Sequence, residues 1–310
     1  MCSYQQPADA LLRHCTVVSW GRLPLLAAHE SAADPSRDLS SAKTKFLLYH
    51  DLASLRGGDK VEARELFRRQ LALMTRWGFS FRSMSEFLAG EASSHKDVVI
   101  TFDDGGKSFI DCALPVLKEF SATATMYVVA GFVGCHGRVM DFLSWDEIEA
   151  LASQGIDIGS HTLSHLLLGE LGADAIRFEI DAAAEIFRAH GLSPATLAYP
   201  YGRRSDAAKQ AVRDSGFQAA FMIKKGGHDA FELRRRLFTL SEPEPLVRFF
   251  LSDNYFPVRK SIVSVVPERF RREGKPIPPE LLGANAFGIE AWQPPESVRA
   301  QWATVHAVSG

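Results

Sequence analysis

Two carboxylates follow directly on an apolar run in the first third of the sequence. Residues 98–102 are all apolar or β-branched, and Asp103, Asp104 and two glycines come next. Such a run indicates a buried strand, and Asp-Gly is typical of a strand end. Because α/β proteins build active sites at the carboxyl ends of parallel strands, the two acids are candidates for a metal ligand and a general base. The competing interpretation is a turn that ends the strand and caps a helix.

A second short strand pattern, Ile-Asp-Ile-Gly at residues 156–159, leads into Ser160, His161 and His165. If a helical turn begins at Ser160, both imidazoles lie on one face, within reach of a single ion. Two histidines and one aspartate suit a divalent metal that keeps open positions for water and substrate. Histidines at this spacing also arise by chance on surfaces. The combination with a strand-end acid pair is a much stronger signal.

Three motifs in one order connect these residues to a known family. They are Thr-Phe-Asp-Asp-Gly at residues 101–105, Ser-His-Thr-x-x-His at 160–165 and Tyr-Pro-Tyr-Gly at 199–202. Together they resemble the first three motifs of the polysaccharide deacetylase family, the NodB-homology domain. The resemblance spans about residues 45–238 and is confined to that span. It implies a distorted (β/α) barrel of about seven parallel strands.

The hydrophobic pattern independently predicts an α/β fold with its site at the strand carboxyl ends, because strand and helix patterns alternate. Helices are predicted at residues 61–77, 83–88, 109–117, 145–153, 173–190 and 206–214, and further strands at 45–51, 122–129, 196–198 and 217–223. We assign residues 1–44 to a variable, partly disordered extension and residues 45–240 to the barrel. Residues 241–310 are rich in proline, which predicts an irregular extension, either packed on the barrel or loosely attached.

Hydrolysis of an amide needs an activated water, a charge sink for the oxyanion and a proton for the leaving amine. The resemblance implies that Asp104, His161 and His165 hold one divalent metal, and that Asp103 accepts the proton of the water. Zinc is the default metal on ligand type, but this set also accepts cobalt, nickel or iron.

The third motif is expected to stabilise the oxyanion. The resemblance implies that the backbone N–H of Tyr201 is the second oxyanion donor, beside the metal. Pro200 is expected to fix the approach of that peptide, and Gly202 to leave space beside it.

The proton donor is expected at the amino-terminal side of the barrel. Residues 48–50, Leu-Tyr-His, resemble the Leu-x-His motif in the family branch where it precedes the Asp-Asp strand, as in the exopolysaccharide N-acetylglucosamine deacetylases. A closed barrel permits this order because its first and last strands are neighbours. The resemblance therefore points to His50 as the acid. A strand-end histidine held by a local hydrogen bond is the other interpretation, with His228 as the next candidate acid.

One departure from the family pattern concerns the base. Ala198 stands where many members place an arginine that orients the catalytic aspartate. We expect Arg235 to supply this charge from a later strand. Arg234 and Arg236 stay open as alternatives, because the alignment could slip by one residue.

Composition excludes several other classes of protein. The formal net charge is -2 and there is no long basic stripe, so nucleic acid is not expected as a partner, whereas a neutral saccharide suits the chain. The four cysteines form no Cys-x-x-Cys pair, which argues for free thiols and against a thiolate zinc site. Cys135 and His136 together are a weak metal candidate. The basic segment 269–275 could bind anionic lipid or a partner, but a solvated helix face is the favoured interpretation.

Charged residues interrupt every apolar run in the first forty residues, and no window is long enough to cross a bilayer. These patterns predict a soluble protein without a signal peptide, located in the cytoplasm, and leave its oligomeric state open. The predicted function is removal of N-acetyl groups from an amino-sugar-containing saccharide by hydrolysis of a carbon-nitrogen bond. The alternatives are a metal-dependent amidase or esterase for a small non-saccharide substrate, and a non-catalytic carbohydrate-binding barrel.

Overall fold

A computed structural model of the 310-residue chain describes residues 43–53, 59–90, 94–223, 229–257, 283–290 and 292–307. Several predictions lie outside these ranges: nearly all of the amino-terminal extension, Cys2, Cys15, His228 and the basic segment 269–275.

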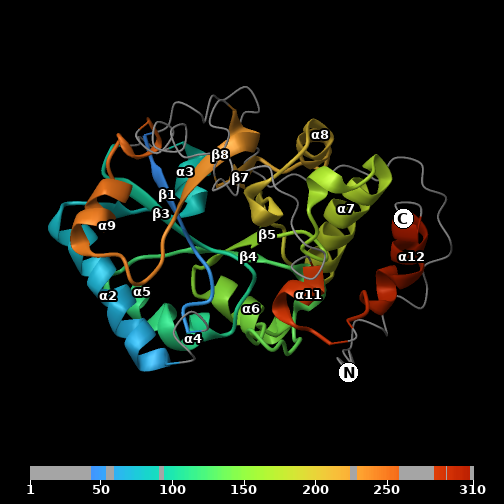
Figure 1. The fold of residues 1–310 in the computed structure, drawn as a ribbon, viewed down its shortest axis with the longest axis horizontal. Helices are drawn as coiled ribbons and strands as arrows, with labels where there is room; N and C mark the ends of the chain where they lie inside the picture. The colour runs from blue at the N-terminus through green and yellow to red at the C-terminus, as the bar shows by residue number, and fades with distance from the viewer. Residues whose placement is uncertain are drawn as a thin grey trace, which may run out of the picture.

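Parallel strands form one closed sheet (Figure 1). The neighbours run β1-β8-β7-β6-β5-β4-β3, and β1 also pairs with β3, which closes a ring of seven strands. The two-residue strand β2 pairs with the beginning of β3, while β4 pairs with its end. The predicted distorted barrel of about seven parallel strands is therefore confirmed. The strands are β1 (Lys45–Tyr49), β2 (Ser80–Phe81), β3 (Asp97–Phe102), β4 (Thr125–Val128), β5 (Asp157–Ser160), β6 (Thr196–Ala198), β7 (Ala219–Met222) and β8 (Leu233–Leu237).

Alternate residues of each strand serve two different cores, as the period of two in a strand requires. On β1, Phe46 belongs to a cluster with Val99, Tyr127 and Phe221, contributed by strands around the ring. The neighbouring residue, Leu47, belongs to a larger cluster between strands and helices. The barrel interior is thus filled with side chains, and residues that share the inward register of Phe46 meet inside it.

Helices cover the barrel where the hydrophobic pattern predicted them. α6 (Trp145–Ser153) and α8 (Asp206–Asp214) have the predicted bounds, and α2 (Lys60–Arg76), α3 (Met84–Ala89) and α7 (Ala173–Ala189) differ by a residue or two. Serines cap α3 and α6, each with a glutamate in a reciprocal capping box. The helix predicted at 109–117 is divided into α4 (Ser108–Cys112) and α5 (Leu114–Glu119), because Pro115 lies in the first turn of α5.

The chain beyond residue 240 contributes helices to two sides of the barrel. α9 (Glu244–Phe250) lies near α2, and α11 (Gly283–Phe287) and α12 (Arg299–Ala307) lie on the opposite side (Figure 1). Val247 and Leu251 are buried in the larger core cluster. The described parts of this region are therefore packed on the barrel. The division of the chain into three regions stays a prediction.

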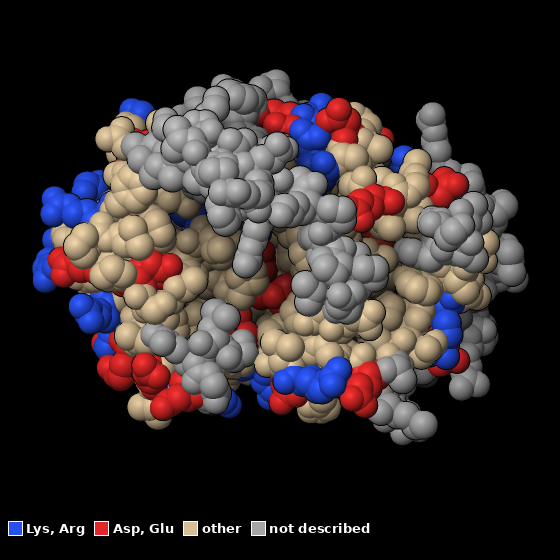
Figure 2. Space-filling model, viewed as in Figure 1, with Lys and Arg blue, Asp and Glu red and all other residues tan. Residues whose placement is uncertain are grey.

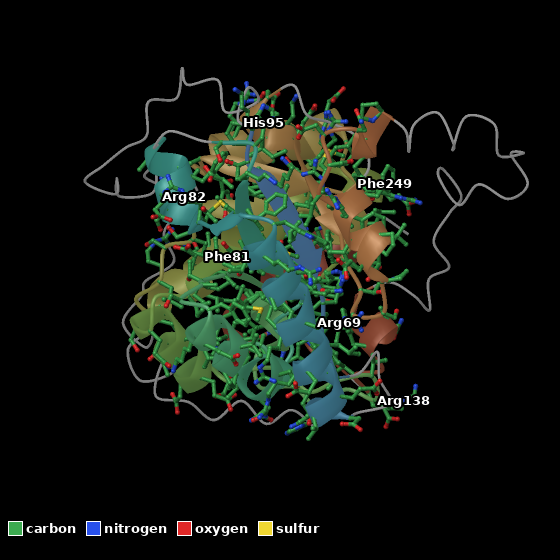
Figure 3. All side chains as sticks on the ribbon, turned by 90° about the vertical axis from the view of Figure 1, so that its left-hand side faces the viewer. Arg69, Phe81, Arg82, His95, Arg138 and Phe249 are labelled. Carbon is green, nitrogen blue, oxygen red and sulfur yellow. The ribbon has the colours of Figure 1, made fainter. Side chains whose placement is uncertain are left out.

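Lys and Arg alternate with Asp and Glu over the face shown in Figure 2, in keeping with the small net charge. The side view in Figure 3 separates the two ends of the barrel. His95, just before β3, lies at the end where strands begin, and Arg138 lies at the end that receives the strand carboxyl termini. A search of the described residues for a helix able to cross a membrane finds none of sufficient length and apolarity.

Candidate active site

Asp104, His161 and His165 converge at the carboxyl ends of β3 and β5. All three are buried, and one ligand atom from each lies within 4.8 Å of the others. Asp104 Oδ1 is 3.5 Å from His161 Nε2 and 3.4 Å from His165 Nε2. Among the described residues this is the one group of acid, histidine or cysteine side chains able to hold a metal ion. The structure therefore brings together the three predicted ligands.

The backbone that presents these ligands is not helical. No helical turn begins at Ser160: residues 161–165 form a loop in which Thr162 and His165 have φ of 67° and 54°. Asp104 (φ 76°) and Tyr201 (φ 59°) are also left-handed, so four of the five described non-glycine residues with positive φ lie at this site. Such conformations cost energy and persist where the surroundings fix them, which is typical of functional sites.

The donor set fits a divalent cation. Asp104 Oδ1 is buried without a hydrogen-bond partner in the described structure, a costly arrangement that a cation would relieve. His161 Nδ1 lies 2.7 Å from the carbonyl oxygen of Ala198, so Nδ1 carries the proton and Nε2 keeps its lone pair for a metal. Ligand distances of about 2.0–2.2 Å in a tetrahedral zinc site separate two ligands by roughly 3.4 Å, close to the separations seen here.

The electrostatics of the ligands agree with this interpretation. Burial, and then the neighbouring Asp103 charge, raise the pKa of Asp104 well above its usual range. Burial lowers the pKa of His161 to about 4 and that of His165 well below its usual value. The histidines are therefore neutral at pH 7, as metal ligands must be, and the acid needs a cation to hold its charge.

Asp103 is held by an arginine of β8, 132 positions further along the chain. Arg235 Nη1 and Nη2 donate to Asp103 Oδ1 and Oδ2 over 2.6 and 2.7 Å, and Nη1 also donates to Thr101 Oγ1 over 3.1 Å. Burial acts to raise the pKa of Asp103, but the charge and the hydrogen bonds of Arg235 outweigh it and hold that pKa below its usual range. Asp103 is therefore an ionised carboxylate 3.7 Å from His161 Nε2.

The strand register distinguishes the three candidate arginines. Arg235 lies opposite Phe46 in the β1–β8 pairing, so it shares the inward register. Arg234 instead lies over the ring of Phe256, and Arg236 over those of Phe256 and Tyr255. Of the three, Arg235 is the one that contacts Asp103.

His50 follows β1 and lines a small pocket together with Asp103. The two are linked through the backbone, because Asp103 N–H donates to the carbonyl of Tyr49 over 3.0 Å. Burial of the ring lowers the pKa of His50, although the Asp103 charge opposes this shift. The Leu-Tyr-His motif, which precedes the Asp-Asp strand in this chain, thus brings His50 beside Asp103, the expected base. Its role as an acid stays a prediction.

Pro200, Tyr201 and Gly202 form a tight turn after β6. Proline opens this turn, and the positive φ of Tyr201 redirects its peptide. A Cβ on Gly202 would lie 2.8 Å from the backbone nitrogen of Ile223, so only glycine fits at this φ of 61°. The space beside Gly202 is therefore occupied by the backbone and side chain of Ile223. The oxyanion role of the Tyr201 N–H stays a prediction.

Three contributors to the site were not predicted from the sequence. Glu179 of α7 is fully buried and accepts hydrogen bonds from Ser164 N (2.9 Å) and Ser164 Oγ (2.5 Å), inside the histidine loop. The Tyr201 hydroxyl lies 3.1 Å from His165 Nδ1, and the ring of Phe287 lies 5.3 Å from that of His165. Glu179 lies on the apolar stripe of α7, and a glutamate in that position indicates a buried polar partner. No sequence pattern indicates the contacts of Tyr201 and Phe287 with His165.

The other metal candidate is not supported. Cys112 and Cys135 are both buried, and the imidazole of His136 lies 2.9 Å from Asp141 at the surface. No second metal-binding group includes either Cys135 or His136 within the part of the chain that the structure describes.

Comparison with known proteins gives one family. Residues 90–220 match the family model described as polysaccharide deacetylase. YxkH of Bacillus subtilis (strain 168), which carries the name of a polysaccharide deacetylase, is 26% identical over 190 residues, 60% of this chain and 66% of the relative. The poly-beta-1,6-N-acetyl-D-glucosamine N-deacetylase of Staphylococcus aureus (strain MSSA476) is 23% identical over 51% of this chain and 60% of the relative. The chain thus spans less than two thirds of the length of these curated relatives.

Solved structures share the fold. IcaB from Ammonifex degensii aligns with a TM-score of 0.58 and 24% identity, covering 67% of this chain and 97% of that one. The Streptococcus pyogenes deacetylase PplD, solved in complex with acetate, aligns with a TM-score of 0.59 and 22% identity, covering 67% and 98%. At these identities the likeness concerns the arrangement of the barrel.

Proposed function

We propose that this protein, whose residues 90–220 match the polysaccharide deacetylase family model, is a metal-dependent hydrolase that removes N-acetyl groups from an amino-sugar-containing saccharide. The observation that carries the proposal is the position of the Asp103 carboxylate, ionised by its pairing with Arg235, against the Asp104, His161 and His165 cluster. This arrangement supports a role for Asp103 as the acceptor of a proton from a water that an ion in the cluster would activate.

Asp104, His161 and His165 would hold the ion, which when bound lowers the pKa of water and polarises the acyl oxygen. Asp103 accepts the proton of the attacking water, and Arg235 keeps the carboxylate ionised and oriented for this step. The Tyr201 N–H donates to the developing oxyanion. His50 gives a proton to the leaving nitrogen. Because burial lowers the pKa of His50, its ring is largely neutral at pH 7. The proton that His50 gives to the leaving nitrogen is then the one that Asp103 takes from the attacking water, passed on within the pocket that both residues line.

For the substrate class we infer a polymer or oligomer of N-acetylglucosamine. The Staphylococcus aureus relative is named for poly-beta-1,6-N-acetyl-D-glucosamine, and the permuted position of His50 in this chain resembles the exopolysaccharide branch. The small net charge of the chain suits a neutral saccharide. Zinc is the default ion on ligand type, with cobalt, nickel or iron as other candidates.

The test is acetate release from N-acetylglucosamine oligomers of different linkage, with the metal-loaded and the chelator-treated protein. We expect release that depends on the ion and is restored when it is returned. Asp104→Ala, His161→Ala and His165→Ala should each lose most of the bound ion. Turnover confined to small ureides or aryl esters would favour the amidase or esterase alternative. An ion-free protein that binds oligosaccharide without releasing acetate would point to a carbohydrate-binding barrel.

A further inference from the structure

A segment far beyond the family match reaches one of the metal ligands. The backbone N–H of Gly283 donates to the Tyr201 hydroxyl over 3.2 Å, and that hydroxyl lies 3.1 Å from His165 Nδ1. The ring of Phe287 packs edge-on against the His165 ring, with centroids 5.3 Å apart. Both α11 residues thus act on His165, Gly283 through Tyr201 and Phe287 directly.

Residues 283–289 and Trp292 are held beside the site by hydrogen bonds and by buried apolar contacts. Arg138 N and Val139 N donate to the carbonyls of Gly288 (3.3 Å) and Phe287 (3.2 Å), and Trp292 Nε1 donates to the carbonyl of Gly131 over 2.9 Å. Phe287 and Ile289 are buried in a cluster with aromatic residues of the barrel loops.

Small residues of the barrel make this docking possible. A Cβ on Gly137 would lie 2.6 Å from the carbonyl oxygen of Phe287, and one on Gly131 would lie 3.0 Å from the Trp292 ring and 2.5 Å from the Leu163 carbonyl. Side chains at these two positions would therefore push the segment away from the barrel.

The chemistry of the contacts suits a positioning role. A histidine that binds a metal through Nε2 carries its proton on Nδ1, and a fixed acceptor for that proton sets the orientation of the ring. The Tyr201 oxygen has two lone pairs, so it can accept both the Gly283 N–H and the His165 Nδ1–H. His165 needs such support, because it lies in an irregular loop with a φ of 54°.

We propose that residues 283–289 complete the metal site, with the Tyr201 side chain and Phe287 as positioning residues that hold His165 in its metal-binding orientation. The inference rests on the metal site of the proposed function. It gives the Tyr201 side chain a role separate from that of its backbone N–H. It also gives a chain segment outside the family match a part in binding the ion.

The first test is Tyr201→Phe, which keeps the ring and the backbone and removes only the hydroxyl. Affinity for Co²⁺ is measured by competition with a colorimetric chelator, together with the visible absorption of the bound ion. We expect about a tenfold to hundredfold loss of affinity, the usual effect of losing such a partner. The unfolding temperature of the metal-free protein should fall by no more than it does in Tyr199→Phe, which also loses a hydroxyl hydrogen bond. Tyr199→Phe is the matched control, because the Tyr199 hydroxyl donates to Phe231 O instead. It should bind Co²⁺ as the parent does.

The second test compares Phe287→Ala with Ile289→Ala. Both remove buried apolar surface from one cluster, but only Phe287 packs on His165. Phe287→Ala should weaken Co²⁺ binding and alter its absorption, whereas Ile289→Ala should lower stability alone. If Phe287→Ala does not fold, Phe287→Leu serves the same comparison.

The results separate this inference from the proposed function. Parent-like Co²⁺ affinity in both Tyr201→Phe and Phe287→Ala, or equal losses in the two controls, would overturn the positioning role and leave the hydrolase proposal standing. A parent protein that binds no divalent ion would overturn both.

Discussion

Asp103 keeps its negative charge in a place where an isolated carboxylate would lose it. Its side chain is 3% exposed, and the paired nitrogens of Arg235, which is 0% exposed, take the place of water. Breaking such a buried pair by removing one partner costs about 3–5 kcal/mol, because an unpaired charge stays behind. The pair therefore fixes both the ionisation and the direction of the carboxylate.

Replacing Asp103 with asparagine should abolish its ability to accept a proton while leaving an acceptor for Arg235. We expect kcat to fall by about a hundredfold or more, within the range for a positioned base, with one ion still bound per chain. Steady-state kinetics and metal analysis of the purified variant check this. Parent-like turnover would mean that Asp103 only shapes the turn and that another group activates the water.

His50→Ala should distinguish an acid from a structural histidine. An N-acetyl amide needs protonation of its leaving nitrogen, so its turnover should be lost, whereas an activated aryl acetate releases a phenolate without help and should be affected far less. Metal content should not change. Equal losses on both substrates together with loss of the ion would make His50 a ligand or a structural residue, and no loss on either would move the acid elsewhere.

The residue types and spacing predicted that Asp104, His161 and His165 lie together, because they follow closely on β3 and β5, and a parallel barrel gathers the side chains at its strand ends. Which of three consecutive arginines faces Asp103 could not be predicted in the same way. A slip of one residue along β8 exchanges the two faces of the strand, and only the pairing of Phe46 with Arg235 fixes the register.

At the scale of elements, the histidine loop shows where local patterns fail. A spacing of four residues would place both imidazoles on one face of a helical turn, yet residues 161–165 adopt an irregular loop held by long-range contacts. Leu163 N–H donates to the backbone carbonyl of Glu179, and the Glu179 carboxylate accepts from Ser164. The spacing of the two histidines by itself carries no information on a partner in α7. By contrast, α6 and α8 were predicted to the residue because their signals, serine caps and apolar stripes, are local.

Glu179→Ala should loosen this loop. Ser164 would lose the acceptor of its N–H and its hydroxyl in a buried place, and each unsatisfied group costs about 1–3 kcal/mol. We expect a fall of several kcal/mol in the free energy of unfolding and weaker binding of the ion, measured by denaturant titration and chelator competition. Arg188→Ala, on an exposed position of the same helix, is the control. Unchanged stability in Glu179→Ala would show that the loop is held by its other contacts.

At the scale of the whole molecule, the site joins parts of the fold that lie far apart in the chain. Its side chains lie on β8 or in the loops that follow β1, β3, β5 and β6. α11 adds the contacts of Gly283 and Phe287. The sequence predicted the barrel and the ends of its strands. It did not predict the contacts of residues 283–292, because packing without a motif depends on shapes that exist only after folding.

An ion bound by ligands from separate elements should stabilise the whole fold. Because the unfolded chain does not assemble Asp104 with the two histidines, binding adds about 2.7 kcal/mol at a free ion concentration one hundred times Kd. The unfolding temperature should therefore rise with added Zn²⁺ or Co²⁺ and fall after chelation, as scanning calorimetry can measure. Asp104→Ala should show no such rise. A metal-dependent shift of full size in that variant would contradict the assigned ligands.

The long separation between Asp103 and Arg235 has a consequence for the protein while it is being made. The two residues are 132 positions apart. At about 5–20 residues per second a ribosome needs roughly 7–26 s to add that stretch, during which Asp103 has no counter-charge. The ring also cannot close on β1 until β8 has emerged. A nascent chain halted before β8 would therefore expose strand edges and an Asp103 carboxylate without its arginine to chaperones and proteases.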